Sequence, residues 1–489
     1  MTSPTATTYE VVIGIEVHAQ LATKSKMFCS CSADYHNAEP NTHVCPVCLG
    51  MPGVLPVINR QAVEYTIMTG LALNCSIPER AKFDRKNYPY PDLPKGYQIS
   101  QYDLPLCRGG RLAIELDGAT KRIGITRVHL EEDTARSMHV ANGAGDEYSL
   151  VEMNRSGVPL MEIVTEPDVR SGQEARLYLT QLQQILRYLG VSHANMEEGN
   201  MRCEPNVSLR VAGALEFGTK VELKNLNSFR AVEQGIEYEI ERQRKLLDAG
   251  ERVLQETRGW REEEGRTVSQ RSKEFAQDYR YFPEPDLPPL TIGRAYVEEL
   301  RARLPELPQA KHERFVAQYA LSDYEANLLT ASRARADFFE AAVGNDVRLA
   351  KAAANWLLGD VARLLNAEGI EVNEAKLRPA QLHELVVLIE EGTVSTTGAK
   401  SVLEEAFRTG KAPRAIVQEQ GLTQITAAGE LTGVVAQVIA GNPKPVADFR
   451  GGKEAALKAL VGLAMRETRG RANPQLVEEL LRAELAKGG

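Results

Sequence analysis

Four cysteines near the N-terminus of this 489-residue chain form two close pairs. One residue separates Cys29 from Cys31, two residues separate Cys45 from Cys48, and thirteen residues lie between the pairs. A loop that brings two such pairs together offers four thiolate ligands, which is the set that suits tetrahedral zinc. Such a site would be structural, because four protein ligands leave no coordination position for a substrate. Four buried free thiols are the alternative interpretation.

A carboxylate and an imidazole share one face of the segment Ile13–His18. Side chains alternate along a strand, so Glu16 and His18 point to one side while the isoleucine and valine residues between them point to the other. The apolar side can pack on a core. The two polar side chains can then point together into a cleft.

Two further strand-like segments carry acidic residues. In Arg127–Asp133, alternation places His129 and Glu131 on one face, and Glu162 stands between apolar neighbours in Leu160–Val164. Carboxylates with one imidazole suit magnesium or manganese, and a divalent ion held by few carboxylates usually also binds nucleotide phosphates. The alternative is that these residues lie on the solvated faces of antiparallel strands.

Basic residues alternate in a third group of segments. Lys220 and Lys224 share a face with Glu222, and Arg202 shares a face with Arg210. Cations beside a magnesium site stabilise a phosphoryl group during transfer. Charge pairs on an exposed sheet face would give the same pattern, so both interpretations stay open.

The elements that must position these residues are a mixture of strands and helices, which predicts a large α+β domain. Alternation predicts strands over Val11–His18, Lys121–Glu131, Met201–Arg210 and Lys220–Lys224, and helical spacing predicts helices over Gln173–Leu189 and Ala231–Leu247. Four prolines in Tyr281–Leu290 exclude a regular helix or a central strand there, and beyond them the apolar residues follow helical spacing.

We therefore expect three domains: an α+β domain over residues 1–292, an all-α domain over 293–408 and a small all-α tail over 409–489. No apolar stretch approaches the ~18 residues that a membrane-spanning helix needs, and the first residues do not have the pattern of a secretory signal. Seven cysteines are too few for a disulfide scaffold, and an odd number fits a reducing compartment. We expect a cytoplasmic protein that does not associate with membranes.

The charge is distributed unevenly along the chain. The net charge of −8 argues against coating of nucleic acid by the whole surface. Between Lys444 and Arg471, however, seven basic and three acidic residues give a net charge of +4, just before a helix that Asn473 and Pro474 should begin. Basic side chains near a helix N-terminus can hold a phosphate backbone. A solvated helical surface is the alternative.

These residues lie in motifs that make the chain resemble, nearly end to end, the B subunits of the aspartyl/glutamyl-tRNA amidotransferases. The longer motifs are specific to that family. The motifs are Ile13–His18, Cys45–Gly53, Asp92–Gln101, His129–Asp133, Asp278–Asp286 and Gly470–Pro474.

The resemblance implies a ligase that forms a carbon–nitrogen bond with glutamine as the nitrogen donor. In such a heterotrimer, the A subunit is an amidase-type glutaminase that releases ammonia, and the small C subunit ties the assembly together. The B subunit would bind mischarged tRNA(Gln) or tRNA(Asn), phosphorylate the side-chain carboxyl of its Glu or Asp with ATP, and pass the acyl phosphate to ammonia that arrives by a tunnel. The resemblance also implies a cradle-shaped catalytic domain related to the glutamine synthetase fold, a helical domain and a tRNA-binding helical tail.

The resemblance also implies roles for individual residues. His18, Glu131 and Glu162 match the family's magnesium ligands, and Glu16 lies close by in the sequence. Lys86 matches a position near the ammonia route. On their charge alone, we expect phosphate contacts from Arg155, Lys220 and Lys224.

Two other functions compete with this interpretation. A free-standing ligase acting on a small amino acid would use the same chemistry, but it would not need the helical half after Leu290. A non-catalytic, zinc-bearing RNA-binding protein would not need magnesium ligands. The sequence does not distinguish between Glu-tRNA(Gln) and Asp-tRNA(Asn) as the substrate.

Overall fold

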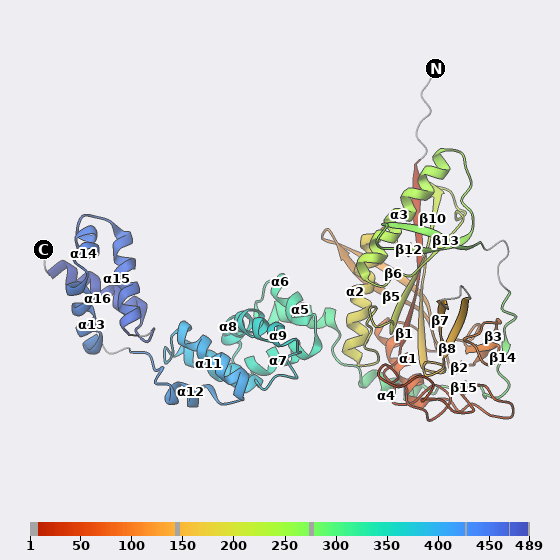
Figure 1. Ribbon diagram of the computed structural model, residues 1–489, viewed down its shortest axis with the longest axis horizontal. Coiled ribbons are helices and arrows are strands. Elements are labelled where there is room, and N and C mark those ends of the chain that lie inside the picture. The colour runs from red at the N-terminus through yellow and green to blue at the C-terminus, as the bar shows by residue number, and fades with distance from the viewer. Residues whose placement is uncertain (1–7, 142–146, 273–277, 426–427, 469, 488–489) are drawn as a thin grey trace, which may run out of the picture. The chain divides into compact units, whose positions relative to one another are not determined.

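The computed structural model describes residues 8–141, 147–272, 278–425, 428–468 and 470–487 (Figure 1). The chain divides into two compact units, Met1–Leu307 and Pro308–Gly489. Each unit is described here by itself.

An eight-stranded sheet forms the centre of the first unit, with strand order β13-β12-β11-β10-β1-β9-β6-β5. Neighbouring strands pair antiparallel, except that β11 and β12 run parallel. The strands are β1 (Tyr9–Gln20), β5 (Cys107–Leu116), β6 (Ala119–Glu132), β9 (Pro159–Thr165), β10 (Met201–Val211), β11 (Val221–Lys224), β12 (Glu256–Arg261) and β13 (Arg266–Ser272).

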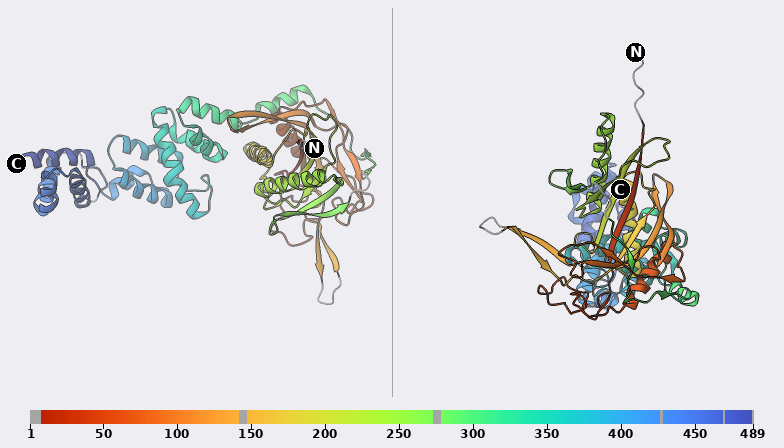
Figure 2. Two further views of the ribbon diagram at one scale, coloured as in Figure 1. Left: turned by 90° about the horizontal axis from the view of Figure 1, so that it is seen from above. Right: turned by 90° about the vertical axis from the view of Figure 1, so that its right-hand side faces the viewer.

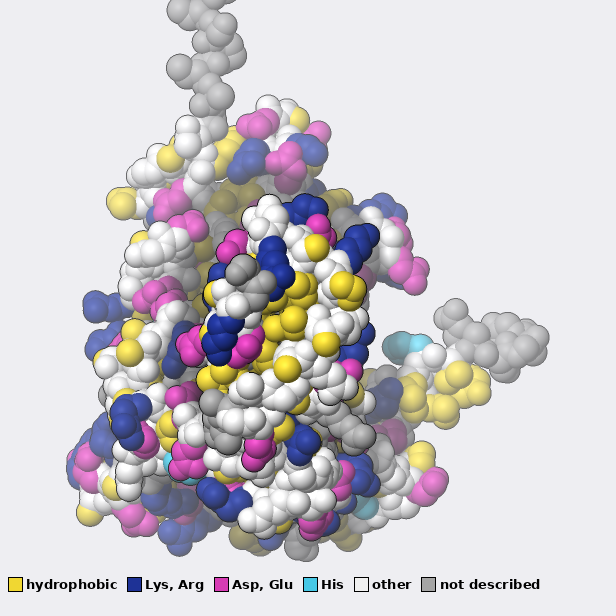
Figure 3. All heavy atoms as spheres, turned by 90° about the vertical axis from the view of Figure 1, so that its left-hand side faces the viewer, with side chains coloured by type: hydrophobic (Ala, Val, Ile, Leu, Met, Phe, Trp, Pro, Cys, Tyr) yellow, Lys and Arg dark blue, Asp and Glu magenta, His cyan; other side chains and the backbone are white. Residues whose placement is uncertain are grey.

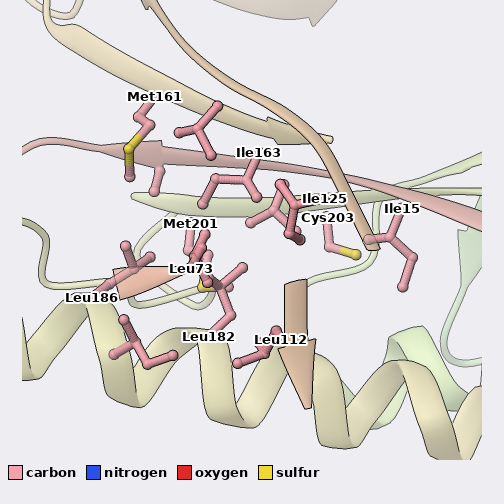
Figure 4. Packing of buried hydrophobic residues seen from close by; sticks show 14 of the residues in the cluster. Ile15, Leu73, Leu112, Ile125, Met161, Ile163, Leu182, Leu186, Met201 and Cys203 are labelled. Carbon is pink, nitrogen blue, oxygen red and sulfur yellow. The ribbon is translucent and has the colours of Figure 1, made fainter. Parts of the chain in front are cut away.

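One face of this sheet is apolar and packs against helices. Ile13, Ile15 and Val17 of β1 are at most 1% exposed, as strand alternation predicts. They share a hydrophobic core with helix α2 (Gly172–Leu189), which supplies Leu182 and Leu186, as Figure 4 shows. Helices α1 (Arg60–Ala72) and α3 (Phe229–Asp248) join the same core.

The ends of α2 match its sequence. The Ser171 side chain accepts a hydrogen bond from the backbone N–H of Glu174, which caps the first turn. Gly190 ends the helix in the left-handed conformation, at a φ of 68° that few other residues adopt. Both residues therefore fix the length of the helix that covers the apolar face.

Smaller strand pairs complete the first unit. A three-stranded sheet joins β14 (Phe282–Pro283), β3 (Asp84–Asn87) and β4 (Tyr97–Ser100), and β15 (Leu290–Thr291) pairs with β2 (Arg80–Ala81). The hairpin of β7 (Arg136–Ala141) and β8 (Glu147–Glu152) projects from the unit (Figure 2). Helix α4 (Arg294–Ala302) follows. The proline-rich segment thus supplies two-residue edge strands, where a missing backbone N–H is tolerated.

In the described part of the second unit, the regular secondary structure is helical, apart from an isolated bridge between Ile425 and Ala472, and loops join the helices. One hydrophobic core runs from Phe315 to Val417 and a second from Leu431 to Leu485. The helices are α5 (Pro308–Tyr319), α6 (Asp323–Thr330), α7 (Arg333–Val343), α8 (Ala350–Trp356), α9 (Ala362–Glu368), α10 (Pro379–Glu390), α11 (Thr396–Thr409), α12 (Pro413–Glu419), α13 (Ala428–Gly441), α14 (Pro443–Arg450), α15 (Glu454–Glu467) and α16 (Pro474–Lys487), with the short turns η1 (Val347–Leu349) and η2 (Leu357–Val361).

The prediction of a mixed α/β region followed by helices is confirmed, and each of the strands and helices predicted above coincides with an observed one. The first compact unit extends past residue 292 to Leu307, because α4 packs with its core. In the described part of the chain, no helix has the length and apolar character that crossing a bilayer requires.

Candidate active site

The polar face of the large sheet forms the floor of a cleft of about 680 Å³. Residues of β1, β6, β9, β10 and β11 supply the floor, and residues in and around the small β3–β4–β14 sheet supply a wall. Among the residues that line this cleft are Glu16, His18, Lys86, Glu131, Glu162, Lys220 and Lys224.

Strand order brings together side chains that are far apart in the sequence. Glu162 of β9 lies opposite His18 of β1 on one side and opposite His129 of β6 on the other. Directly opposite residues in antiparallel strands point to the same face, with their Cβ atoms only ~5 Å apart. Since β9 is the middle strand of the three, one glutamate is shared by two histidines.

Short distances join this group. His18 Nε2 lies 3.4 Å from Glu162 Oε2 and 3.8 Å from Glu131 Oε1. His129 Nε2 lies 3.3 Å from Glu162 Oε2 and 3.7 Å from Glu131 Oε2. One ligand atom each from His18, Glu131 and Glu162 lie within 4.8 Å of one another. Two carboxylates and an imidazole in this arrangement fit the donor set of a hard divalent cation.

The electrostatics of the group favour a bound cation. Burial alone would lower the pKa of His18, but Glu162 and other nearby carboxylates outweigh burial and raise the pKa to about 9. Burial alone would raise the pKa of Glu162, and the two histidines instead hold it well below its usual value. Without a metal, a protonated His18 therefore helps to balance the carboxylates, and a divalent ion could take over that positive charge. His18 Nδ1 is buried and has no hydrogen-bond partner among the described residues.

Glu16 lies two residues before His18 in β1, and the side chains of both residues point to the same face of the sheet. The Asn206 side chain donates a hydrogen bond of 3.1 Å to Glu16 Oε1. Burial, followed by the charge of Glu162, raises the pKa of Glu16 above its usual value. Glu16 therefore lines the cleft beside the three-residue group rather than within it.

Lys86 extends from the small sheet toward the acids. Its Nζ lies 5.0 Å from the ring centroid of Tyr279 and 5.8 Å from that of Tyr88. Burial alone would lower its pKa, but the charges of Glu131 and Glu162 raise it above the usual value for lysine. Lys86 is therefore an ammonium ion at neutral pH, and it cannot accept a proton.

The other predicted cations lie at different places. Lys224 pairs with Glu204 at 3.1 Å and with Glu222 at 3.4 Å. Lys220 lines the cleft and also a neighbouring smaller hollow. The structure does not bring Arg155 to this cleft: its guanidinium donates to the carbonyls of Thr134 and Ala135, and it lines a separate hollow.

Several cleft residues were not assigned a role from the sequence. His129 is one of them, although alternation had placed it on the same face as Glu131. Ser100, which is buried behind the cleft, was not assigned a role either: its hydroxyl donates a hydrogen bond of 2.9 Å to Glu131 Oε2 from a strand that no local pattern links to β6. Tyrosines also line the wall, and their positions follow from the pairing of β14 with β3.

We expect Ser100→Ala to lower activity about 10- to 100-fold, the usual cost of losing a hydrogen bond to a ligand carboxylate. The Glu131 carboxylate would lose a donor that fixes its orientation. Steady-state ADP release as a function of magnesium concentration measures the effect, and the magnesium concentration for half-maximal rate should rise. An unchanged magnesium dependence would mean that Ser100 does not position Glu131.

Asp133 forms a buried clamp at one side of the cleft. It accepts hydrogen bonds from Arg202 at 3.2 Å and from Gln20 at 2.7 Å. Burial alone would raise its pKa, but Arg202 and Arg155 lower it to about 2. The carboxylate therefore ties β6 to β1 and β10.

Asp133→Ala is expected to lower the free energy of unfolding by about 1–3 kcal/mol, because the half-buried Arg202 and the buried Gln20 lose their shared hydrogen-bond acceptor. Urea unfolding measures this change. Asp34→Ala, at an exposed aspartate, is the matched control and should cost less than about 0.5 kcal/mol. Equal stability of the two variants would contradict the clamp.

The four cysteines of the two pairs come together in the first unit. Ligand atoms of Cys29, Cys31, Cys45 and Cys48 all lie within 4.8 Å of one another. The Cys45 and Cys48 sulfurs are 3.8 Å apart, and the backbone N–H of Cys45 points at the Cys48 sulfur over 3.1 Å. A hydrogen bond from Cys29 lowers the pKa of Cys48 to about 4, so one thiolate is already favoured. Four sulfurs at these separations fit tetrahedral zinc.

Comparisons with known proteins agree over nearly the whole chain. The family described as the GatB/GatE catalytic domain matches residues 11–298, and the GatB domain family matches residues 337–485. The B subunit of the aspartyl/glutamyl-tRNA(Asn/Gln) amidotransferase of Dehalococcoides mccartyi (strain CBDB1) is 56% identical over 99% of this chain and 100% of its own length. The protein of the same name from Thermomicrobium roseum is 57% identical over 98% of this chain and 99% of its own. The chain therefore belongs to the family of aspartyl/glutamyl-tRNA(Asn/Gln) amidotransferase B subunits.

Proposed function

We propose that this chain activates the side-chain carboxyl of Glu or Asp on mischarged tRNA(Gln) or tRNA(Asn) with ATP, and converts it to the amide with ammonia. The observation that carries the proposal is the group of His18, Glu131 and Glu162 on the floor of a cleft that is also lined by lysines. The names of the relatives support the substrate class.

The reaction needs activation because a carboxylate has no good leaving group. In the first step, a carboxylate oxygen of the substrate attacks the γ-phosphorus of ATP, the bond from that phosphorus to the bridging oxygen breaks, and ADP leaves. In the second step, ammonia attacks the carbonyl carbon of the acyl phosphate, inorganic phosphate leaves, and the nitrogen loses a proton. The products are the amide on the tRNA, ADP and phosphate.

His18, Glu131 and Glu162 would hold magnesium, with Glu16 close by. When bound, the ion would neutralise phosphate charge during phosphoryl transfer. The histidine offers Nε2, which already faces both carboxylates. The two glutamates stay ionised at neutral pH, because the pKa of each is below its usual value.

Lys86 would stabilise the acyl phosphate with a fixed positive charge. Its raised pKa supports this electrostatic role, because it stays protonated while the phosphoryl group carries negative charge. Lys220 and Lys224 would contact the phosphates of ATP from the other side of the cleft. For Arg155 we propose a phosphate contact only with the tRNA, from its separate hollow.

The assembly belongs to the same proposal. An amidase-type glutaminase, the A subunit, would supply ammonia near Lys86, the small C subunit would complete the heterotrimer, and the complex would work in the cytoplasm.

The three parts of the chain would have different roles: residues 1–292 would form the catalytic part, residues 293–408 the helical part and residues 409–489 the tRNA-binding part. We propose that the catalytic part is related to the glutamine synthetase fold and that the four cysteines hold structural zinc. Exposed Lys444, Arg450 and Arg466 support a tRNA-binding tail. Figure 3 shows Lys and Arg side chains interspersed with Asp and Glu side chains on the face that it draws.

The test is ADP release by the chain purified with its partner subunits, in the presence of ATP, magnesium and ammonium. We expect release with Glu-tRNA(Gln) or Asp-tRNA(Asn), and none with free glutamate or uncharged tRNA. Release with free glutamate would instead identify a ligase for a small amino acid. Binding of tRNA without any release of ADP would identify an RNA-binding protein.

A further inference from the structure

A lysine is buried in the loop that carries the four cysteines. Lys26 is 1% exposed and is among the largest fully buried side chains of the described chain. Lysine is almost never buried so completely unless its charge is paired. Among the described residues, however, Lys26 forms no ion pair with a carboxylate, and its Nζ donates only to two backbone carbonyls. The buried charge therefore needs a counter-charge of another kind.

Lys26 lies between the two cysteine pairs. Its backbone N–H donates to the Cys31 carbonyl at 2.9 Å, which places it against the first pair. Its Nζ donates to the His43 carbonyl at 2.8 Å, two residues before the second pair. A Cβ built on Gly157 would lie 3.5 Å from Cys48 Cβ and 3.7 Å from Lys26 Cδ, so these two side chains border the same small space. The lysine therefore contacts the chain beside both pairs.

The cysteines supply the missing counter-charge when they hold a metal. Zinc is bound by thiolates, and four thiolates around one divalent ion leave the group with an excess of negative charge. Four protonated thiols would offer the lysine no charge at all. Lys26 is close enough to act on the sulfurs, because its charge, after a hydrogen bond from Cys29, is among the causes that lower the pKa of Cys48. A buried ammonium at this place favours the metal-bound thiolates over free thiols.

We propose that Lys26 is the buried counter-cation of the four-cysteine zinc site and strengthens zinc binding through its charge. This inference rests on the zinc site of the proposed function. Lys26 is not a ligand, because four sulfurs fill the tetrahedral positions. It acts from outside the ligand shell, where a positive charge stabilises the negative charge that the sulfurs carry once zinc is bound.

A purely mechanical role is the competing explanation. The Lys26 Nζ also contacts the Met153 carbonyl over 3.5 Å, and Met153 opens the segment that leads into β9. Lys26 could therefore tie the cysteine loop to that segment by hydrogen bonds alone. The two roles have different requirements: a tie needs a hydrogen-bond donor, whereas a counter-cation needs a positive charge.

Three substitutions at Lys26 separate the charge from the hydrogen bonds. Lys26→Met removes both and should weaken zinc binding about 10- to 100-fold, the usual cost of losing a partner that supports metal ligands from outside. Lys26→Gln keeps an N–H donor but not the charge, and it should weaken zinc binding about as much as Lys26→Met. Lys26→Arg keeps both the charge and the donors, so it should recover most of the affinity.

Zinc affinity is measured on the complete heterotrimer by competition with a chromogenic zinc chelator, and zinc content by mass spectrometry. Lys24→Met, at an exposed lysine two residues earlier, is the matched control and should bind zinc like the wild type. If Lys26→Met does not fold, Lys26→Gln and Lys26→Arg decide between the two roles, because both keep a donor and only the second keeps the charge.

Two results overturn the role of the charge. Zinc affinity of Lys26→Gln equal to that of the wild type would leave Lys26 as a hydrogen-bonding tie. Zinc affinity of Lys26→Arg as low as that of Lys26→Gln would likewise contradict a role for the charge, because the two variants would then differ in charge without differing in affinity.

The wild-type complex separates this inference from the rest of the proposed function. If it contains no zinc, the zinc site fails and the role of Lys26 fails with it. If it contains zinc and Lys26→Gln binds zinc more weakly, the inference holds even where charged tRNA elicits no release of ADP, and only the proposed reaction fails.

Discussion

Glu131→Gln should lower ADP release with charged tRNA at least about a thousandfold. The substitution keeps the size of the side chain but removes one of two carboxylates from the group that faces His18. Metal stabilisation of a phosphoryl transition state is worth several kcal/mol, and each 1.36 kcal/mol is a factor of ten in rate. Single-turnover ADP release at saturating ATP measures the loss of the chemical step.

Two observations check that the loss comes from the metal site. Glu115→Gln changes an exposed glutamate on the same large sheet and should match the wild type. Magnesium binding can be monitored by the displacement of bound manganese in a paramagnetic assay. The affinity for magnesium should be lower in Glu131→Gln and unchanged in Glu115→Gln. Full activity in that variant would show that Glu131 is not a required ligand.

Cys45→Ser should release zinc and unfold the surrounding loop, the second large effect that we expect. Residues 26–58 contain no helix and no strand longer than an isolated bridge residue, so the four sulfurs would organise this loop together with scattered hydrogen bonds such as that from Met27 to Gly157. Structural zinc contributes on the order of 10 kcal/mol in small zinc-binding peptides. Metal content by mass spectrometry should fall from one zinc per chain to none, and amide hydrogen exchange in the loop should become fast.

The loop is joined to the active site, so activity should fall as well. The Met27 backbone N–H donates to the Gly157 carbonyl at 2.7 Å, and the Ser156 hydroxyl donates to the Cys48 carbonyl at 3.1 Å. Both contacts hold the segment that leads into β9 and Glu162. Cys75→Ser, at a buried cysteine outside the group, should keep its zinc. Wild-type protein without zinc would refute the prediction.

Alternation along single strands predicted which side chains share a face, and the large sheet confirms that pattern. Because side chains along a strand alternate with a period of two residues, Glu16 and His18 share a face regardless of which strands are their neighbours. Alternation does not say which strands are neighbours, because that depends on the register of segments that lie from 33 residues apart, as for His129 and Glu162, to 144 residues apart, as for His18 and Glu162. Glu162 illustrates this limit: only the central position of β9 brings it between His18 and His129.

Charge alone was a weaker guide than alternation. Arg155 follows β8 and turns its guanidinium to the carbonyls of Thr134 and Ala135, because backbone oxygens in the link between β6 and β7 are nearby acceptors. Lysines on strands of the large sheet, such as Lys224, line the cleft because the sheet itself aims them. The place of Tyr279 and Tyr281 in the wall of the cleft could not be predicted either, since it depends on the pairing of Phe282 with Arg85 across nearly two hundred residues.

That long-range pairing has a consequence for synthesis on the ribosome. A growing chain emerges from the N-terminus at about 5–20 residues per second, so β3 leaves the ribosome well before β14. Arg85 can form its ion pair with Glu284, at 2.7 Å, only after the second strand has appeared. Tyr279 and Tyr281 arrive with it. The acids and histidines of the nascent first unit are therefore synthesised before the part of the wall that Tyr279 and Tyr281 supply, and a ribosome stalled before residue 279 would expose an incomplete cleft.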